Sequence, residues 1–294
     1  MEIIRYVAES KVHVGIRSED GTVRRLAARS LAELLRLPFP VLRALVETGG
    51  VVETADLRML PPVDGLTEVW ASGVTYRRSS MARQEESVVA DVYARVYEAD
   101  RPELFFKSVP WRVVGHDEPI GVRPDSEINV PEAELAVVVN AAGEIVGATI
   151  CDDVSSRSIE GENPLYLPQA KVYSGSCAIG PGIRPIWEIE DLQSLNIQVR
   201  VERSGETAWA GSTNTDMLNR TPADLVGFLR RHASFPDGVV LSTGTGLVPE
   251  MDFDLQSGDT VVIEIESVGV LSNPVIPATT DEFAWLTPDP ARAP

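Results

Sequence analysis

The stretch Pro131-Glu-Ala-Glu-Leu-Ala-Val-Val-Val139 contains two acids, separated by one residue, at the start of an apolar run. On a strand, residues i and i+2 face the same side of the sheet. Glu132 and Glu134 therefore place two carboxylates on one face, while Leu135, Val137 and Val139 line the other. Neighbouring carboxylates repel each other unless a cation lies between them. Taken alone, this pattern is better explained as a solvated strand face.

A second strand-like run, Gly147-Ala-Thr-Ile-Cys-Asp-Asp153, ends in two further acids. Adjacent strand residues point to opposite faces, so only one of Asp152 and Asp153 can join Glu132 and Glu134. A third carboxylate completes a set of hard oxygen ligands that suits Mg²⁺, with Mn²⁺ or Ca²⁺ as alternatives. Taken alone, the two acids are better explained as the end of a strand in a turn.

Two other segments could complete such a site. Lys171 lies in a turn-rich segment among apolar or small residues. Three carboxylates and a divalent cation sum to about −1, so a nearby ammonium would balance the charge. A lysine with a lowered pKa can also carry protons, although most lysines are simply surface residues. The hydroxyl and backbone N–H groups of Ser242-Thr-Gly-Thr-Gly246 could cradle a substrate carboxylate.

Composition and charge narrow the function classes. The chain has 294 residues, 44% of them hydrophobic and 24% charged, as in an ordinary globular protein. Twenty-six basic and 44 acidic residues give a formal charge of −18, which argues against nucleic acid and anionic membranes as partners. No apolar run approaches the ~20 residues of a membrane span, so we expect a cytoplasmic protein that acts on a small molecule. Cys151 and Cys177 form no CxxC pair, which excludes a zinc–thiolate site.

Turns and proline-rich segments divide the chain into three predicted units. Residues 1–65 form a small α/β domain with strands at 3–8 and 11–16 and helices at 30–37 and 40–48. Residues 66–277 form a larger domain, and residues 278–294 a loosely held, polar tail. The larger domain has predicted strands at 68–74, 104–107, 134–139, 145–151, 197–201, 239–242 and 260–265. It also has a predicted helix at 80–98 capped by Ser79 or Ser80, and a predicted helix at 221–231 capped by Thr221. This spacing predicts a β-rich α+β fold.

The order and spacing of these segments resemble the fumarylacetoacetate hydrolase (FAH) superfamily from about Glu68 to Val275. The matching motifs are Leu104-Phe-Phe-Lys107 for F-x-K, Glu132-Ala-Glu134-Leu for E-x-E-L, Asp152-Asp153-Val-Ser-Ser-Arg157 for N-D-V-S-A-R-D, Ala170-Lys171 for A-K, Ser242–Gly246 for T-G-T-P, Gly258-Asp259 for G-D, and Gly269-Val-Leu-Ser-Asn-Pro274 for G-x-L-x-N-P. The resemblance implies a mixed β-roll/sandwich for the larger domain, with Glu132, Glu134 and Asp153 as metal ligands. It also implies a homodimer or homotetramer.

One departure from the family pattern concerns the catalytic dyad. Hydrolases of the superfamily carry G-x-N-Y-x-x-H-x-x-E, whose histidine and glutamate activate water for C–C cleavage. The aligned segment begins at Gly73, and it has Ser79 in place of the histidine and Ala82 in place of the glutamate. Because no imidazole remains to serve as the base, the standard acylpyruvase mechanism is disfavoured.

Other segments resemble the branch of the superfamily that contains 2-keto-3-deoxy-D-arabinonate dehydratase and its sugar-acid relatives. They are Ser72-Gly-Val-Thr-Tyr76, Met81-Ala-Arg-Gln-Glu-Glu-Ser87, Arg101-Pro-Glu103-Leu-Phe-Phe-Lys107, Val113-Val-Gly-His-Asp-Glu-Pro119 and Glu160-Gly-Glu-Asn-Pro-Leu-Tyr-Leu-Pro-Gln169. This resemblance implies a Mg²⁺ enzyme in which Glu103 and Lys171 are catalytic and Ser80–Glu98 forms a mobile lid. The substrate contacts that it implies are Ser80, Met81, Lys107, Tyr76 and Thr245.

The function expected from this branch is dehydration of a 2-keto-3-deoxy sugar acid, such as 2-dehydro-3-deoxy-D-arabinonate to 2,5-dioxopentanoate and water. Either Glu103 or Lys171 takes the C3 proton, and the other helps the 4-hydroxyl leave. We favour Glu103 as the acid and Lys171 as the base, although the sequence does not decide between them. The alternatives are a hydrolase that cleaves an acylpyruvate or other β-diketo acid, and a non-catalytic protein that binds a metal and a sugar acid.

Overall fold

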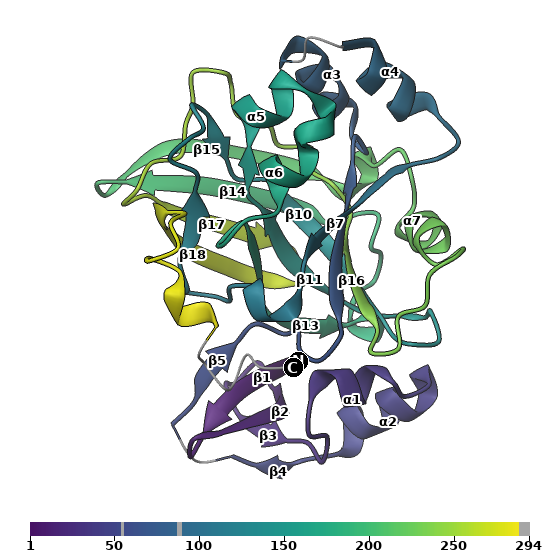
Figure 1. Ribbon diagram of the computed structural model, residues 1–294. Helices are drawn as coiled ribbons and strands as arrows, with labels where there is room; N and C mark the ends of the chain where they lie inside the picture. Colours follow the sequence, from purple (N-terminus) through teal and green to yellow (C-terminus); the bar gives the residue numbers. More distant parts are fainter. Residues whose placement is uncertain (54–55, 87–89, 288–294) are drawn as a thin grey trace.

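The computed structural model describes residues 1–53, 56–86 and 90–287 and confirms the β-rich α+β fold (Figure 1). Its α-helices are α1 (Leu31–Leu35), α2 (Phe39–Thr48), α3 (Arg77–Glu86), α4 (Ala90–Glu98), α5 (Arg157–Glu162), α6 (Leu167–Lys171) and α7 (Pro222–Leu229). The strands of the larger sheet are β1 (Glu2–Ala8), β2 (Lys11–Arg17), β3 (Val23–Arg25), β4 (Val51–Val52), β5 (Arg58–Leu60), β6 (Glu68–Gly73), β7 (Glu103–Ser108), β10 (Ala133–Val139), β11 (Ile145–Asp153), β13 (Cys177–Pro185) and β16 (Val239–Ser242). The strands of the second sheet are β8 (Ile120–Val122), β14 (Asn196–Arg203), β15 (Glu206–Asn214), β17 (Thr260–Ile265) and β18 (Gly269–Pro277). A short separate pair consists of β9 (Asn129–Val130) and β12 (Ser155–Ser156).

The larger sheet runs in the order β4-β3-β2-β1-β13-β11-β10-β16-β6-β7, with β5 paired to β1. The N-terminal strands join it through antiparallel pairing of β1 with β13, in which Ile3 lies opposite Ile183. Strands β1 to β5 therefore extend the same sheet that carries β10 and β11, at the lower end of Figure 1. The division of the chain at residue 65 stays a prediction.

The second sheet, in the order β15-β14-β17-β18-β8, packs against part of the larger sheet. Leu135 of β10 and Ile150 of β11 share one buried apolar cluster with Ile197, Ile263 and Leu271 of the second sheet. Burial of this apolar surface is the main favourable contribution to the packing of the two sheets.

Both faces of β10 are buried, since all seven of its residues are inaccessible. Ala136 and Val138 pack with apolar residues of α1 and α2, whereas Val137 and Val139 pack with α7. A strand that is covered on both faces reads as a continuous apolar run. This explains why the acids before that run stand out in the sequence.

The observed helix ends agree with the sequence at α7 and differ at α3. α7 begins with the predicted Thr221 cap, which forms a reciprocal capping box with Asp224. α3 begins at Arg77, so Ser79 and Ser80 lie in its first turn and neither is the N-cap. The Ser79 hydroxyl instead donates to the Tyr76 carbonyl at 2.8 Å. Residues 87–89 of the predicted lid lie outside the described residues. The helices on either side of them, α3 and α4, lie at the same end of the molecule as α5 (Figure 1).

The C-terminal segment is held more firmly than the sequence predicted. Phe283 and Leu286 are buried in the cluster between the two sheets, and the Phe283 ring lies against Gly121 and Gly175. The apolar side chains at these two positions offset the polar, proline-rich composition on which the loose tail was predicted. Residues 288–294 of that tail lie outside the described residues.

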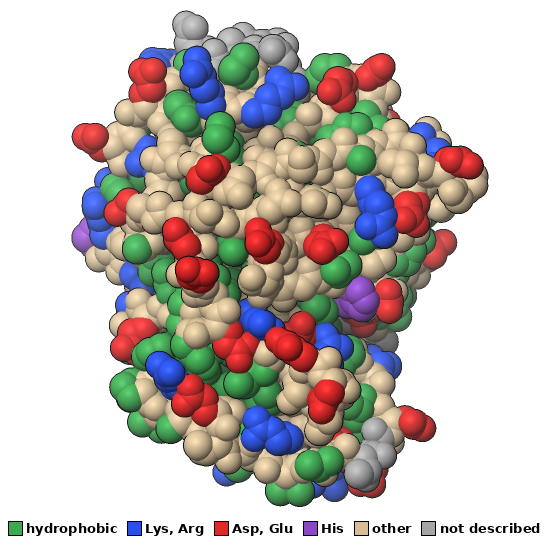
Figure 2. Space-filling model, turned by 180° about the vertical axis from the view of Figure 1, so that it is seen from behind, with side chains coloured by type: hydrophobic (Ala, Val, Ile, Leu, Met, Phe, Trp, Pro, Cys, Tyr) green, Lys and Arg blue, Asp and Glu red, His purple; other side chains and the backbone are tan. Residues whose placement is uncertain are grey.

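Acidic and basic side chains are interspersed on the face shown in Figure 2. Within the described ranges, no helix has the length and apolar character needed to cross a membrane. Cys151 and Cys177 are buried free thiols.

Candidate active site

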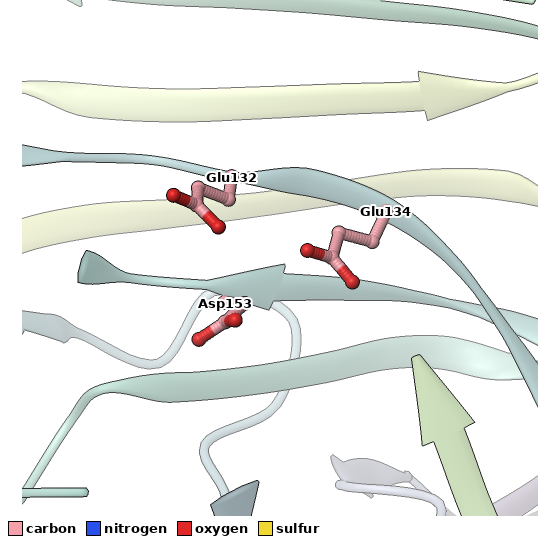
Figure 3. Close-up of side chains that lie close together, drawn as sticks. All are labelled: Glu132, Glu134 and Asp153. Carbon is pink, nitrogen blue, oxygen red and sulfur yellow. The ribbon is translucent and has the colours of Figure 1, made fainter. Parts of the chain in front are cut away.

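Glu132, Glu134 and Asp153 point toward one another from two neighbouring strands (Figure 3). Glu134 lies on β10, Glu132 immediately precedes it, and Asp153 ends β11. The antiparallel register pairs Ala133 with Asp152, and the Asp153 N–H donates to the Glu132 carbonyl at 3.0 Å. All three side chains are buried, and each offers a carboxylate oxygen within 4.8 Å of the others.

Two of these carboxylates are held by cationic side chains. Glu132 accepts from Arg157 Nη2 on one oxygen at 3.1 Å and from Lys171 Nζ on the other at 2.8 Å. Asp153 accepts from Lys171 Nζ at 2.9 Å on one oxygen, and its second oxygen forms an ion pair with Lys107. Breaking a buried ion pair leaves an uncompensated charge, so these contacts fix the position of both carboxylates.

Glu134 is held by neutral donors. Its Oε2 accepts from the Ser242 hydroxyl at 2.5 Å and from the Gly244 N–H at 2.8 Å. The Ser242–Gly246 turn, which was predicted to cradle a substrate carboxylate, therefore uses these two groups on Glu134. Burial, followed by the negative charges of Asp153 and Glu132, raises the pKa of Glu134 well above its usual value.

The cluster fits a hard divalent cation. Three buried carboxylates at this separation repel each other, and the raised pKa of Glu134 expresses that cost. Mg²⁺ prefers oxygen ligands of this kind, and its charge would offset the repulsion. Asp152 points away from the cluster: its Oδ1 accepts from the Glu132 N–H at 3.0 Å, and burial raises its pKa to about 8.

Lys171, the last residue of α6, lies directly beside the carboxylates. Its Nζ donates to Glu132, to Asp153 and, at 2.5 Å, to the Ser155 hydroxyl, and it lies 5.6 Å from the centre of the Phe105 ring. Each of the three ammonium hydrogens therefore has an oxygen acceptor.

One pocket opens onto the cluster. Its lining residues are Ser72, Gly73, Val74, Ser79, Glu103, Phe105, Glu132, Glu134, Asp153, Glu160, Lys171, Thr245 and Val248. The predicted catalytic pair, Glu103 and Lys171, therefore faces the same space as the three carboxylates. Ser79, at the position of the missing histidine, also lines this space. Among the described residues, the buried Ser72 hydroxyl has no hydrogen-bond partner, which suits it to a polar ligand.

The carboxyl group of Glu103 lies next to a glycine on the neighbouring strand. Gly73 of β6 is directly opposite Glu103 of β7 in the antiparallel register. A Cβ atom at residue 73 would lie 2.0 Å from Glu103 Oε2 and 2.7 Å from its Cδ. The absence of a side chain at residue 73 therefore provides the space that the Glu103 carboxyl occupies.

The five predicted substrate contacts occupy different places. Thr245 lines the pocket, and its hydroxyl accepts from the Leu247 N–H at 3.0 Å. Tyr76 and Ser80 are buried outside this lining, whereas Met81 is 47% exposed. Burial, and then the charge of Glu134, raises the pKa of Tyr76 above its ordinary value.

Lys107, the fifth predicted contact, is fully buried beneath the carboxylates rather than on the pocket wall. Its Nζ donates to the Val154 carbonyl at 3.2 Å and to the Lys171 carbonyl at 2.6 Å, and it pairs with Asp153. Because these three oxygens occupy its hydrogens, Lys107 is suited to position Asp153 and the Lys171 backbone.

Sequence reasoning missed the roles of Arg157 and Glu160. Both occur in the quoted motifs, but nothing in their spacing shows that one clamps Glu132 and the other lines the pocket. They lie three residues apart on α5, which places them on one helix face. That spacing is the one feature of the sequence that could have linked them.

Known proteins are similar to most of this chain. A protein from Haloferax volcanii described as a probable 2-keto-3-deoxyxylonate dehydratase is 52% identical over 79% of this chain and 80% of its own length. The 2-dehydro-3-deoxy-D-arabinonate dehydratase of Saccharolobus solfataricus is 46% identical over 75% of each chain.

Solved structures agree with these relatives. The structure described as 2-keto-3-deoxy-D-arabinonate dehydratase complexed with magnesium and 2,5-dioxopentanoate superposes with a TM-score of 0.83 at 37% identity, covering 94% of this chain and 98% of its own. A family profile described as fumarylacetoacetate (FAA) hydrolase C-terminal matches residues 68–276. The chain therefore belongs to the fumarylacetoacetate hydrolase family.

Proposed function

We propose that this protein is a Mg²⁺-dependent dehydratase that converts 2-dehydro-3-deoxy-D-arabinonate, or a close stereoisomer, into 2,5-dioxopentanoate and water. The observation that carries the proposal is the pocket, in which three buried carboxylates lie with Lys171 and Glu103. A serine stands at position 79, where a hydrolase would place its histidine base, and this favours elimination over hydrolytic C–C cleavage. The names of the two dehydratase relatives and of the product complex support the same substrate class.

The metal site, Glu103 and Lys171 have separate roles in the proposed reaction. When bound to the three carboxylates, Mg²⁺ supplies the Lewis acidity that polarises a 2-keto group and makes the C3 hydrogens acidic. Lys171 Nζ donates to the carboxylates of Glu132 and Asp153, as an ammonium group does, and an ammonium group can act as an acid. We therefore infer that Glu103 takes the C3 proton and Lys171 protonates the departing 4-hydroxyl. This order reverses the one favoured from the sequence.

The conversion of the sugar acid into the aldehyde has two stages, and the atoms balance in each. In the first, the C3–H and C4–O bonds break, a C3=C4 double bond forms, and water leaves behind 5-hydroxy-2-oxopent-3-enoate. In the second, C5 loses a hydrogen, C3 and C4 each gain one, and the 5-hydroxyl loses its proton to become the aldehyde. Both stages are proton transfers, so no oxidant is required.

The direct test is an NMR time course with the purified protein, Mg²⁺ and 2-keto-3-deoxy-D-arabinonate, repeated with EDTA. We expect an aldehyde signal that depends on the metal. Glu103→Gln should retain Mg²⁺ binding by calorimetry and turn over at least about 100-fold more slowly. An unchanged sugar acid together with cleavage of acetylpyruvate would instead establish the hydrolase, and stoichiometric binding without turnover would establish the non-catalytic alternative.

The predicted cellular setting is part of the proposal. A cytoplasmic location suits an enzyme of sugar-acid breakdown, and a homodimer or homotetramer is expected from the family resemblance. Light scattering of the purified protein at several concentrations measures the number of subunits.

A further inference from the structure

Glu160 is a pocket carboxylate that the elimination step does not use. It lies on α5 one turn after Arg157, whose guanidinium binds Glu132. Its side chain is only 4% exposed and lines the same pocket as Glu103 and Lys171. α5 therefore presents both a clamp for a metal ligand and a second acid from one helix face.

The position of Glu160 separates it from the metal cluster. Among the described residues, the carboxylates whose oxygens gather within 4.8 Å are Glu132, Glu134 and Asp153. Glu160 thus lies on the pocket wall beyond that cluster. Burying a carboxylate costs free energy, so one that faces a catalytic pocket suggests a chemical role.

The second stage of the reaction requires such a group. The cation site would hold the 2-keto end of the substrate, and the C4–C5 end would then extend toward the rest of the pocket. Glu103 and Lys171 account for the loss of water, but the aldehyde also requires that a hydrogen leave C5 and that C4 gain one. We propose that Glu160 carries out the proton transfers at C5 and C4, an inference that rests on the proposed function.

The transfers balance within the pocket. The Glu160 carboxylate takes a proton from C5, the double bond moves from C3=C4 to C4=C5, and Glu103 returns to C3 the proton that it took earlier. Glu160 then gives its proton to C4, and the C5–O bond becomes the aldehyde carbonyl. The 5-hydroxyl proton replaces the one that Lys171 gave to water, so all three side chains return to their starting states.

The variant Glu160→Gln tests this assignment through the products. We expect the variant to retain Mg²⁺ binding and water loss, and to form the aldehyde at least about 100-fold more slowly, since general acid–base catalysis contributes 10²–10⁴-fold. The enone with its vinylic protons should therefore accumulate in the NMR time course. Glu162→Gln, the same change at an exposed position of α5, should behave as the wild type.

Two further measurements complete the test. The wild-type protein should convert isolated enone into the aldehyde, whereas Glu160→Gln should not. Glu160→Asp, which keeps a shorter carboxylate, should restore part of the aldehyde formation, and it replaces the Gln variant if that variant does not fold.

Several results would overturn the assignment. These are aldehyde formation by Glu160→Gln at the wild-type rate, a raised KM with unchanged products, and no conversion of the enone by the wild type. Failure of the proposed function itself looks different, because the wild-type protein would then release no water from the sugar acid.

Discussion

Replacing Gly73 with alanine should reduce catalysis while leaving the fold and the metal site intact. The new Cβ would lie 2.0 Å from Glu103 Oε2, so the carboxyl must retreat by more than about 1 Å to reach an ordinary contact distance. Gly73 is not among the residues with positive φ, so the backbone accepts alanine without strain. Because the displaced atoms end a flexible side chain, the effect on the free energy of unfolding should stay within about 1 kcal/mol.

The effect on the rate should be much larger. A misplacement of about 1 Å can cost about 100-fold, which corresponds to about 2.7 kcal/mol of transition-state stabilisation. We expect kcat of Gly73→Ala to fall by about this factor, with little change in KM or in the Mg²⁺ dissociation constant. Gly227→Ala is the matched control, since an added Cβ there meets nothing within 4 Å.

A double-mutant cycle separates positioning of Glu103 from a general disturbance. If Gly73 acts through Glu103, alanine at residue 73 should cost little more once Glu103 has become glutamine. An equal fall in both backgrounds would refute the reasoning, as would a Gly73→Ala protein whose kcat stays within about threefold of the wild type. Steady-state rates and calorimetric Mg²⁺ titrations supply both quantities.

Three further predictions concern stability and the metal. Lys107→Met should weaken Mg²⁺ binding in calorimetry and destabilise the fold by about 3–5 kcal/mol in urea unfolding. The substitution removes one of the two ammonium groups that hold Asp153, and it takes a buried donor away from the Val154 and Lys171 carbonyls. In EDTA, the melting temperature should fall as the pH rises from about 4 to about 8. The reason is that Asp152, with its pKa raised to about 8, keeps a proton in the folded state that the unfolded chain has released. A melting temperature that stays flat or rises over this range contradicts this prediction. Thr221→Ala should remove the cap of α7 and cost about 1 kcal/mol in urea unfolding without altering kcat.

The sequence by itself determined seven strands of the larger domain and the chemical nature of the site, but it did not predict β13, β15 or β18. Alternation placed Glu132 and Glu134 on one side of a strand, and the apolar run after them predicted the strand at 134–139 that the structure contains as β10. The burial of both faces of that strand was not predicted, because the pattern alone favoured a solvated face. Local capping chemistry likewise predicted the start of α7 at Thr221. These features depend on residues close together in the chain, so periodicity and turn chemistry suffice to find them.

Only the tertiary structure decided which groups meet. The residue pattern alone left Asp152 and Asp153 as alternatives, and the family resemblance named Asp153. The register of β10 with β11 places Asp153 beside Glu132 and Glu134, and the turn after β16 brings its donors to Glu134. The Lys107 ammonium proved to be a buried support, and Glu160 proved to line the pocket. Such contacts depend on strand register and helix packing between distant segments, which a single sequence does not encode in any local pattern.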